Sequence, residues 1–140
     1  MRKTRRLAAP VIVMVLAVSV SSTAVAQLTK DTAIAKAEAL VKNLQDGKTA
    51  EIVKEFDARM TKELPEAKLS PVWSALVSKF GAFRQIQERR EGPFKDRQAV
   101  ELILAFDKET IVNRIVFDAE GKVTGLVFQP LASAVLPAGK

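Results

Sequence analysis

The sequence contains no cysteine, no histidine and no tyrosine among its 140 residues. The absence of cysteine excludes disulfide bonds and an N-terminal lipid attached to cysteine. Without cysteine and histidine, the chain also lacks the side chains that activate most catalytic nucleophiles and hold most protein-bound zinc. It has no aspartate-rich calcium loop and no glycine-rich phosphate loop. We therefore expect no catalytic residues of these kinds, no metal and no cofactor.

The first 26 residues have the composition of an export signal. Four basic residues lie at positions 2–6, and an apolar run of 14 residues follows from Leu7 to Val20. This run is shorter than the ~20 residues that a membrane-spanning helix needs. Small residues before Ala26 fit the cleft of a signal peptidase, so we predict cleavage after Ala26. An uncleaved anchor is the alternative. The prediction is a secreted or periplasmic protein without a stable membrane span.

The charge of the remaining chain is close to balance. Removing four basic and no acidic side chains lowers the net charge from +6 to +2. The stretch 84–97 holds five basic and three acidic residues, a mixture typical of a solvated strand edge. Nucleic-acid binding would need an uncompensated basic stripe with aromatic residues between the charges. We therefore expect no nucleic-acid partner.

Apolar residues at helical spacing predict helices in the first half of the chain. Residues 30–46 have apolar side chains at three- and four-residue intervals, and Gly47 suits a helix end. Thr49 is a plausible cap for a second helix, and Asp57 for a short segment after it. Such caps stabilise a helix because their side-chain oxygen accepts an N–H of the first turn.

Ser70 and Pro71 predict the start of the last helix, which Gly81 would end. After Gly81 the apolar spacing changes from helical to alternating, which is typical of strands. Gly92-Pro93 and Lys95-Asp96 are expected to turn the chain between the first two strands. Four strands are predicted over residues 82–91, 98–107, 110–118 and 122–129.

This order of elements predicts one α+β domain over residues 27–130. A four-stranded antiparallel meander must bury one face, and only the helices are available to cover it. We expect the N-terminal helices to pack in the concave face of a curved sheet, as in a cone. Residues 131–140 are expected to form a loose C-terminal tail.

Several short motifs resemble a bacterial family known as domain of unknown function 3887. They are Phe56-Asp57, Met60, Leu64, Leu69, Trp73, Leu76, Gly81, Phe83, Val116-Phe117-Asp118, Gly121-Lys122-Val123, Gly125-Leu126, Phe128 and Pro130. The resemblance covers about residues 32–130. It implies the cone of the nuclear transport factor 2-like, or cystatin-like, superfamily. Relatives often carry the domain ahead of a hydrolase, which implies a separate hydrolase partner for this chain.

The resemblance carries over no catalytic residue. Enzymes of the superfamily place an Asp–His pair, or an Asp with a Tyr, inside the cone, and this chain has no His and no Tyr. Among the acidic residues, Asp57 is the first candidate for a functional role, since it lies beside Phe56 in the matched motif. One interpretation is an N-cap, and the other is a polar group at the mouth of the cone.

A cone of this kind often leaves an apolar pocket at its wide end. The candidate ligand-binding residues are Phe56, Asp57, Met60, Trp73, Phe80, Phe83, Leu104, Phe106 and Phe128. We therefore expect a non-catalytic binding or interaction module with a small apolar ligand in the cone. The alternatives are an accessory domain for a separately encoded hydrolase, and a small isomerase or hydrolase-like enzyme using a buried carboxylate such as Asp57.

The central strands are apolar on both faces. Ile103 and Ala105 alternate with Leu102 and Leu104. A sheet with one face in water should instead alternate between apolar and polar residues. We expect the outer face to be covered by a second copy, in a homodimer, or by another partner.

Overall fold

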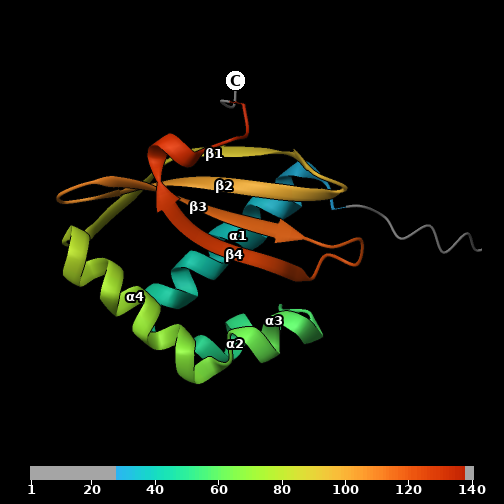
Figure 1. Ribbon diagram of the computed structural model, residues 1–140, viewed down its shortest axis with the longest axis horizontal. Coiled ribbons are helices and arrows are strands. Elements are labelled where there is room, and N and C mark those ends of the chain that lie inside the picture. Colours follow the sequence, from blue (N-terminus) through green and yellow to red (C-terminus); the bar gives the residue numbers. More distant parts are fainter. Residues whose placement is uncertain (1–27, 138–140) are drawn as a thin grey trace, which may run out of the picture.

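The computed structural model describes residues 28–137, in which helices precede an antiparallel sheet (Figure 1). The predicted export signal lies outside the described residues. The helices are α1 (Lys30–Gln45), α2 (Thr49–Val53), α3 (Ala58–Glu63) and α4 (Glu66–Phe80). The strands are β1 (Phe83–Phe94), β2 (Arg97–Phe106), β3 (Thr110–Phe117) and β4 (Val123–Pro130), followed by the 3-10 helix η1 (Leu131–Ser133). The predicted α+β class is confirmed.

The first helix follows the sequence pattern closely. Thr29 caps α1, because its hydroxyl oxygen accepts the N–H of Thr32 at 3.1 Å. Gly47 follows the helix with a φ of 72°, a left-handed conformation that glycine adopts without steric cost. The buried face of α1 consists of Ala33, Ala37, Leu40, Val41 and Leu44. These are the residues that helical spacing predicts.

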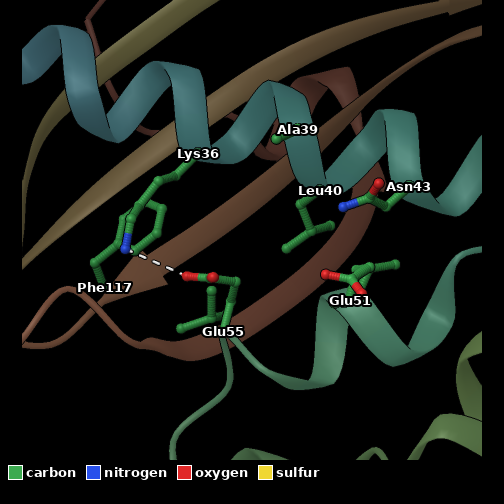
Figure 2. Close-up of a pocket in the computed structure, with 9 residues that line it drawn as sticks. Lys36, Ala39, Leu40, Asn43, Glu51, Glu55 and Phe117 are labelled. Atoms are coloured by element: carbon green, nitrogen blue, oxygen red, sulfur yellow. Dashed lines mark hydrogen bonds and ion pairs between the residues drawn. The ribbon is translucent and has the colours of Figure 1, made fainter.

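The short helices connect α1 to the rest of the domain. Asp57 caps α3, as predicted. Thr49 is the first residue of α2 rather than its cap, and its hydroxyl donates to Glu66 at the start of α4, at 2.9 Å. Figure 2 shows α2 beside α1, where the Lys36 ammonium donates to the Glu55 carboxylate at 3.3 Å.

The predicted start of α4 at Ser70 and Pro71 is wrong. The helix begins at Glu66, with Pro65 before it, and Pro71 lies inside it. Leu69 is fully buried, and a helical turn ahead of Ser70 points this side chain into the core. Burial of the Leu69 side chain favours this earlier start, although Pro71 has no backbone N–H to donate inside the helix. Glu66 favours the early start, since an acidic residue in the first turn stabilises a helix.

The four strands form a meander in the order β1-β2-β3-β4. The predicted turn at Gly92-Pro93 is wrong, because both residues belong to β1 and pair with Ala99 and Gln98. Proline is tolerated there because β1 is an edge strand, whose outward N–H groups need no partner strand. The chain turns only at residues 95–96, where Lys95 has a φ of 59°.

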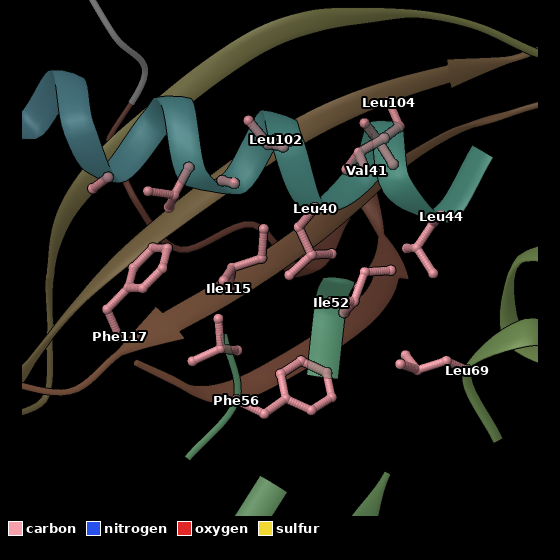
Figure 3. Packing of buried hydrophobic residues seen from close by; sticks show 14 of the residues in the cluster. Leu40, Val41, Leu44, Ile52, Phe56, Leu69, Leu102, Leu104, Ile115 and Phe117 are labelled. Atoms are coloured by element: carbon pink, nitrogen blue, oxygen red, sulfur yellow. The ribbon is translucent and has the colours of Figure 1, made fainter. Parts of the chain in front are cut away.

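One face of the sheet packs against the helices. Alternate residues of β2 point toward α1 and are buried there, among them Val100, Leu102 and Leu104. Figure 3 shows Leu102 and Leu104 facing Leu40 and Val41 of α1. This inner face supplies most of the apolar area whose burial stabilises the fold.

The opposite, outer face of the sheet is buried as well at its centre. The buried residues are Ala99, Glu101 and Ile103 of β2, and Val112 and Arg114 of β3. The sequence predicted a loose tail over residues 131–140, whereas residues 133–136 lie against this face and hydrogen-bond to its side chains. We name residues 133–136 the C-terminal strap. Its Leu136 is buried and lies against Gly92 of β1.

No helix in the part of the chain that the structure describes is long and apolar enough to cross a membrane.

Candidate functional site

The residues predicted to line a pocket fall into separate groups. Phe56 and Met60 are buried near the start of β4, where Phe56 forms a parallel bridge with Val123. Figure 3 shows Phe56 facing the core among other apolar side chains. Leu104 is fully buried under the helices. These three residues stabilise the core and line none of the cavities described below.

Asp57 is an N-cap. Its carboxylate oxygen accepts the backbone N–H of Met60 at 2.8 Å. This hydrogen bond lowers the pKa of Asp57 below its ordinary value of 3.8, and burial opposes it only in part. A carboxyl group that acts as a general acid at neutral pH would need a raised pKa. The arrangement therefore holds an ionised carboxylate at a helix start, which suits a structural role.

Four aromatic residues form one cluster at the α4 end of the sheet. The rings of Trp73, Phe80 and Phe83 surround that of Phe106, with centroid separations of 5.7, 6.0 and 5.5 Å, respectively. Trp73 and Phe83 also contact each other at 5.6 Å in an edge-to-face arrangement. These separations are typical of packed aromatic pairs. The cluster fills the end of the core.

A cavity of about 300 Å³ lies between α4 and the adjoining ends of β3 and β4. We name it the α4 cavity. Its apolar walls are Ala75, Leu76, Phe80, Ile111, Phe128 and Pro130, and its polar residues are Lys79, Glu109 and Gln129. Of the nine predicted site residues, Phe80 and Phe128 line it. The volume is at the lower end of the range for small-molecule sites.

A second cavity, of about 160 Å³, lies between α1, α2 and the end of the β3–β4 hairpin. We name it the α1–α2 pocket. Its floor is Leu40, Ile52, Phe117 and Val123. Lys36 at its rim also donates to the carbonyl of Gly121 at 3.0 Å. Figure 2 shows the Lys36–Glu55 pair across the opening. A cavity of this size holds about one benzene-sized molecule.

The outer sheet face carries a buried ion pair that the sequence pattern did not indicate. Glu101 is fully buried, and its Oε2 accepts from the Nε and Nη2 of Arg114 at 3.0 and 2.9 Å. The ring of Phe94 lies 5.0 Å from the Arg114 guanidinium, a favourable cation–π contact. The only sequence signal is an acidic residue within the apolar stretch 99–106 of β2, and the strand register places it opposite Arg114.

Backbone groups of the C-terminal strap form further hydrogen bonds with this ion pair. Glu101 Oε1 accepts the backbone N–H of Leu136 at 2.6 Å and that of Val135 at 3.1 Å. Arg114 donates to the carbonyl of Ser133 at 2.8 Å, and Arg90 to that of Leu136 at 3.3 Å. Side chains of the sheet thus bind both the N–H and the carbonyl groups of the strap.

No group of three or more acidic, histidine or cysteine side chains in the described residues is placed to hold a metal ion.

A model for a protein of unknown function (DUF3887) matches residues 37–126. The match covers well over half of the 140 residues. The chain belongs to this family. No curated protein and no solved structure matches it. The DUF3887 region includes most of α1, the other helices and most of the sheet, and it ends two residues before Phe128. The strap lies beyond it.

Proposed function

We propose that this DUF3887 protein is an exported, non-catalytic binding module that holds a small apolar ligand in the α4 cavity. The observation that carries the proposal is the cavity itself. Its walls combine aliphatic and aromatic side chains from α4, β3 and β4. Small-molecule sites have this composition, with few polar groups to orient the ligand.

The charged groups beside the cavity support an apolar rather than an ionic ligand. Lys79 and Glu109 are exposed and carry opposite charges, so neither sign dominates at the opening. Leu76, Phe80 and Phe128 are partly buried and present apolar surface to the interior. Covering that surface with a ligand would contribute about 25 cal/mol for each Å² removed from water.

The arrangement of the fold and the composition of the N-terminus support two further parts of this proposal. Helices that cover one face of a four-stranded antiparallel sheet are the arrangement of the nuclear transport factor 2-like cone, which supports membership of that superfamily. The composition of residues 1–26 supports export to the periplasm or the medium, with removal of the signal.

The geometry around the carboxylates favours binding over catalysis. The pKa of Asp57 is lowered by the Met60 N–H. The pKa of Asp107 is lowered chiefly by its hydrogen bond to Arg84. Both groups are therefore ionised at neutral pH, and neither can donate a proton as a general acid there.

A thermal-shift experiment tests the ligand proposal. A panel of small aromatic and aliphatic compounds is added to the purified protein. A compound at ten times its Kd would raise the Tm by about 5 °C for a domain of this size. Ala75→Trp fills the α4 cavity and should abolish the shift. Ala39→Trp, on the rim of the α1–α2 pocket, is the matched control and should keep it. Equal shifts in both variants would place the ligand elsewhere.

A protein partner on the outer sheet face is the second candidate. Among the described residues, three large apolar side chains are exposed, and they lie on β4 and after it: Val127 at 39 %, Leu131 at 42 % and Val135 at 59 %. They support a homodimer, or a contact with a separate hydrolase. Light scattering on the purified protein at several concentrations tests the homodimer. A dimer that Val127→Lys dissociates would support it, and a monomer at every concentration would contradict it. Co-purification from the exported fraction tests the hydrolase partner.

A further inference from the structure

Asn113 is a buried polar residue without a partner. It lies in the middle of β3, and its side chain is fully buried. Neither its amide nitrogen nor its amide oxygen has a hydrogen-bond partner. Buried polar groups in proteins are nearly always paired, because an unpaired group loses its hydrogen bonds to water and gains none in return. An unpaired amide therefore requires an explanation.

The surroundings of Asn113 offer no such pairing. Its cross-strand neighbours are Leu102 on β2 and Phe128 on β4. On its own strand, Ile111 and Ile115 point to the same face of the sheet. All four are apolar. Leucine has the same number and branching of side-chain heavy atoms and is apolar like these neighbours, so the surroundings alone give no reason for asparagine.

Asn113 adjoins the α4 cavity. Phe128 and Ile111, two of its nearest neighbours on the inner face, line that cavity. The Phe128 ring belongs to an edge strand and is only partly buried. Asn113 itself does not line the cavity, so a ligand there would reach its amide through a change in the Phe128 side-chain rotamer.

We propose that the α4 cavity binds a compact apolar molecule with one neutral group that both donates and accepts a hydrogen bond, and that this group pairs with Asn113. A carboxamide or a hydroxyl group has this capacity. A neutral group is favoured because the four neighbours of Asn113 are apolar and offer no counter-charge. The inference rests on the proposed function and adds the ligand's polar group to it.

The experiment compares three small aromatic ligands of similar size: toluene, benzyl alcohol and benzamide. Their Kd values are measured by NMR titration of the full-length protein and of the Asn113→Leu variant. Two hydrogen bonds to a buried amide predict about tenfold tighter binding of benzamide than of toluene to the unaltered protein. Asn113→Leu should bind toluene at least as well and benzamide about tenfold more weakly.

Two further measurements separate this role from a structural one. The side-chain NH₂ signal of Asn113 is assigned by its loss in Asn113→Leu, and it should shift with benzamide far more than with toluene. Asn113→Leu should also have an equal or higher Tm without ligand, since an unpaired polar group is replaced by an apolar one. Asn43→Leu, in the α1–α2 pocket, is the control and should leave all ligand affinities unchanged.

The outcomes distinguish the inference from the proposed function. If none of the three ligands binds and the broader panel gives no Tm shift, the ligand proposal itself fails. If all three bind and Asn113→Leu changes none of the affinities, only the role of Asn113 is refuted. An Asn113 side-chain NH₂ signal that benzamide does not shift would also refute it, because the amide would then not contact the ligand.

Discussion

Removing the Arg114 guanidinium should be one of the most damaging single changes to this fold. Arg114→Met retains most of the side-chain length but leaves Glu101 without its two charged hydrogen bonds. Glu101 is fully buried, so water cannot replace them. Loss of one member of a buried ion pair typically costs about 3–5 kcal/mol. That is a large fraction of the about 5–15 kcal/mol that holds a typical domain folded.

Removing both charges should cost much less. In Glu101→Leu/Arg114→Met neither charge of this pair remains buried, and the cost that remains is the loss of the hydrogen bonds from the strap N–H groups to Glu101. A buried pair replaced by apolar residues is often nearly neutral, so we expect a loss of about 0–2 kcal/mol. The double variant should therefore be more stable than Arg114→Met alone.

Urea unfolding followed by the fluorescence of Trp73, the single tryptophan, measures these free energies. Lys54→Met is the control, because the Lys54–Glu51 pair is exposed and should contribute at most about 0.5 kcal/mol. A loss below about 1 kcal/mol for Arg114→Met would refute the reasoning. So would a double variant that is less stable than either single variant.

Three further predictions concern the helix ends and the N-terminus. Asp57→Ala should cost about 1 kcal/mol of stability. Because the folded-state pKa of Asp57 is lowered, this contribution is full above the ordinary pKa of 3.8 and is lost as the pH falls through the folded-state pKa. Urea titrations of both proteins at pH 7 and pH 3 would detect the difference. Gly81→Ala should lower the Tm more than Gly47→Ala does. Both glycines have a positive φ, but a Cβ at position 81 would lie 2.6 Å from the Asp107 Cβ, whereas a Cβ at position 47 would meet no atom within 4 Å. N-terminal sequencing of the exported protein should begin at Gln27; a retained N-terminus would indicate an anchor.

Apolar spacing and capping residues predicted helices and strands well where the signal lies within the element itself. The five apolar positions of α1 and the cap at Asp57 required no knowledge of other segments. The start of α4 was misplaced because Ser70 and Pro71 form a good local signal, whereas burial of Leu69 depends on helices elsewhere in the chain. Gly92 and Pro93 were misread as a turn for a similar reason, since only the edge position of β1 allows them to remain in a strand.

The candidate site was harder to predict than the fold. Residues that line a cavity and residues that fill a core are equally apolar, so the sequence cannot separate Phe128 from Phe106. The separation depends on how α4 lies against the sheet. Asn113 did not stand out either, because a single polar residue in a strand usually points to solvent, and only the register with Leu102 and Phe128 places it inside.

The strap has a practical consequence for anyone who shortens or fuses this domain. The family match stops at residue 126, inside β4, whereas the backbone partners of Glu101 extend to Leu136. A chain trimmed to the matched region would lose these partners and uncover the apolar centre of β2 and β3, and apolar patches of that kind promote aggregation. The unit that folds is therefore longer than the unit that sequence similarity delimits, and a fusion junction belongs after residue 137.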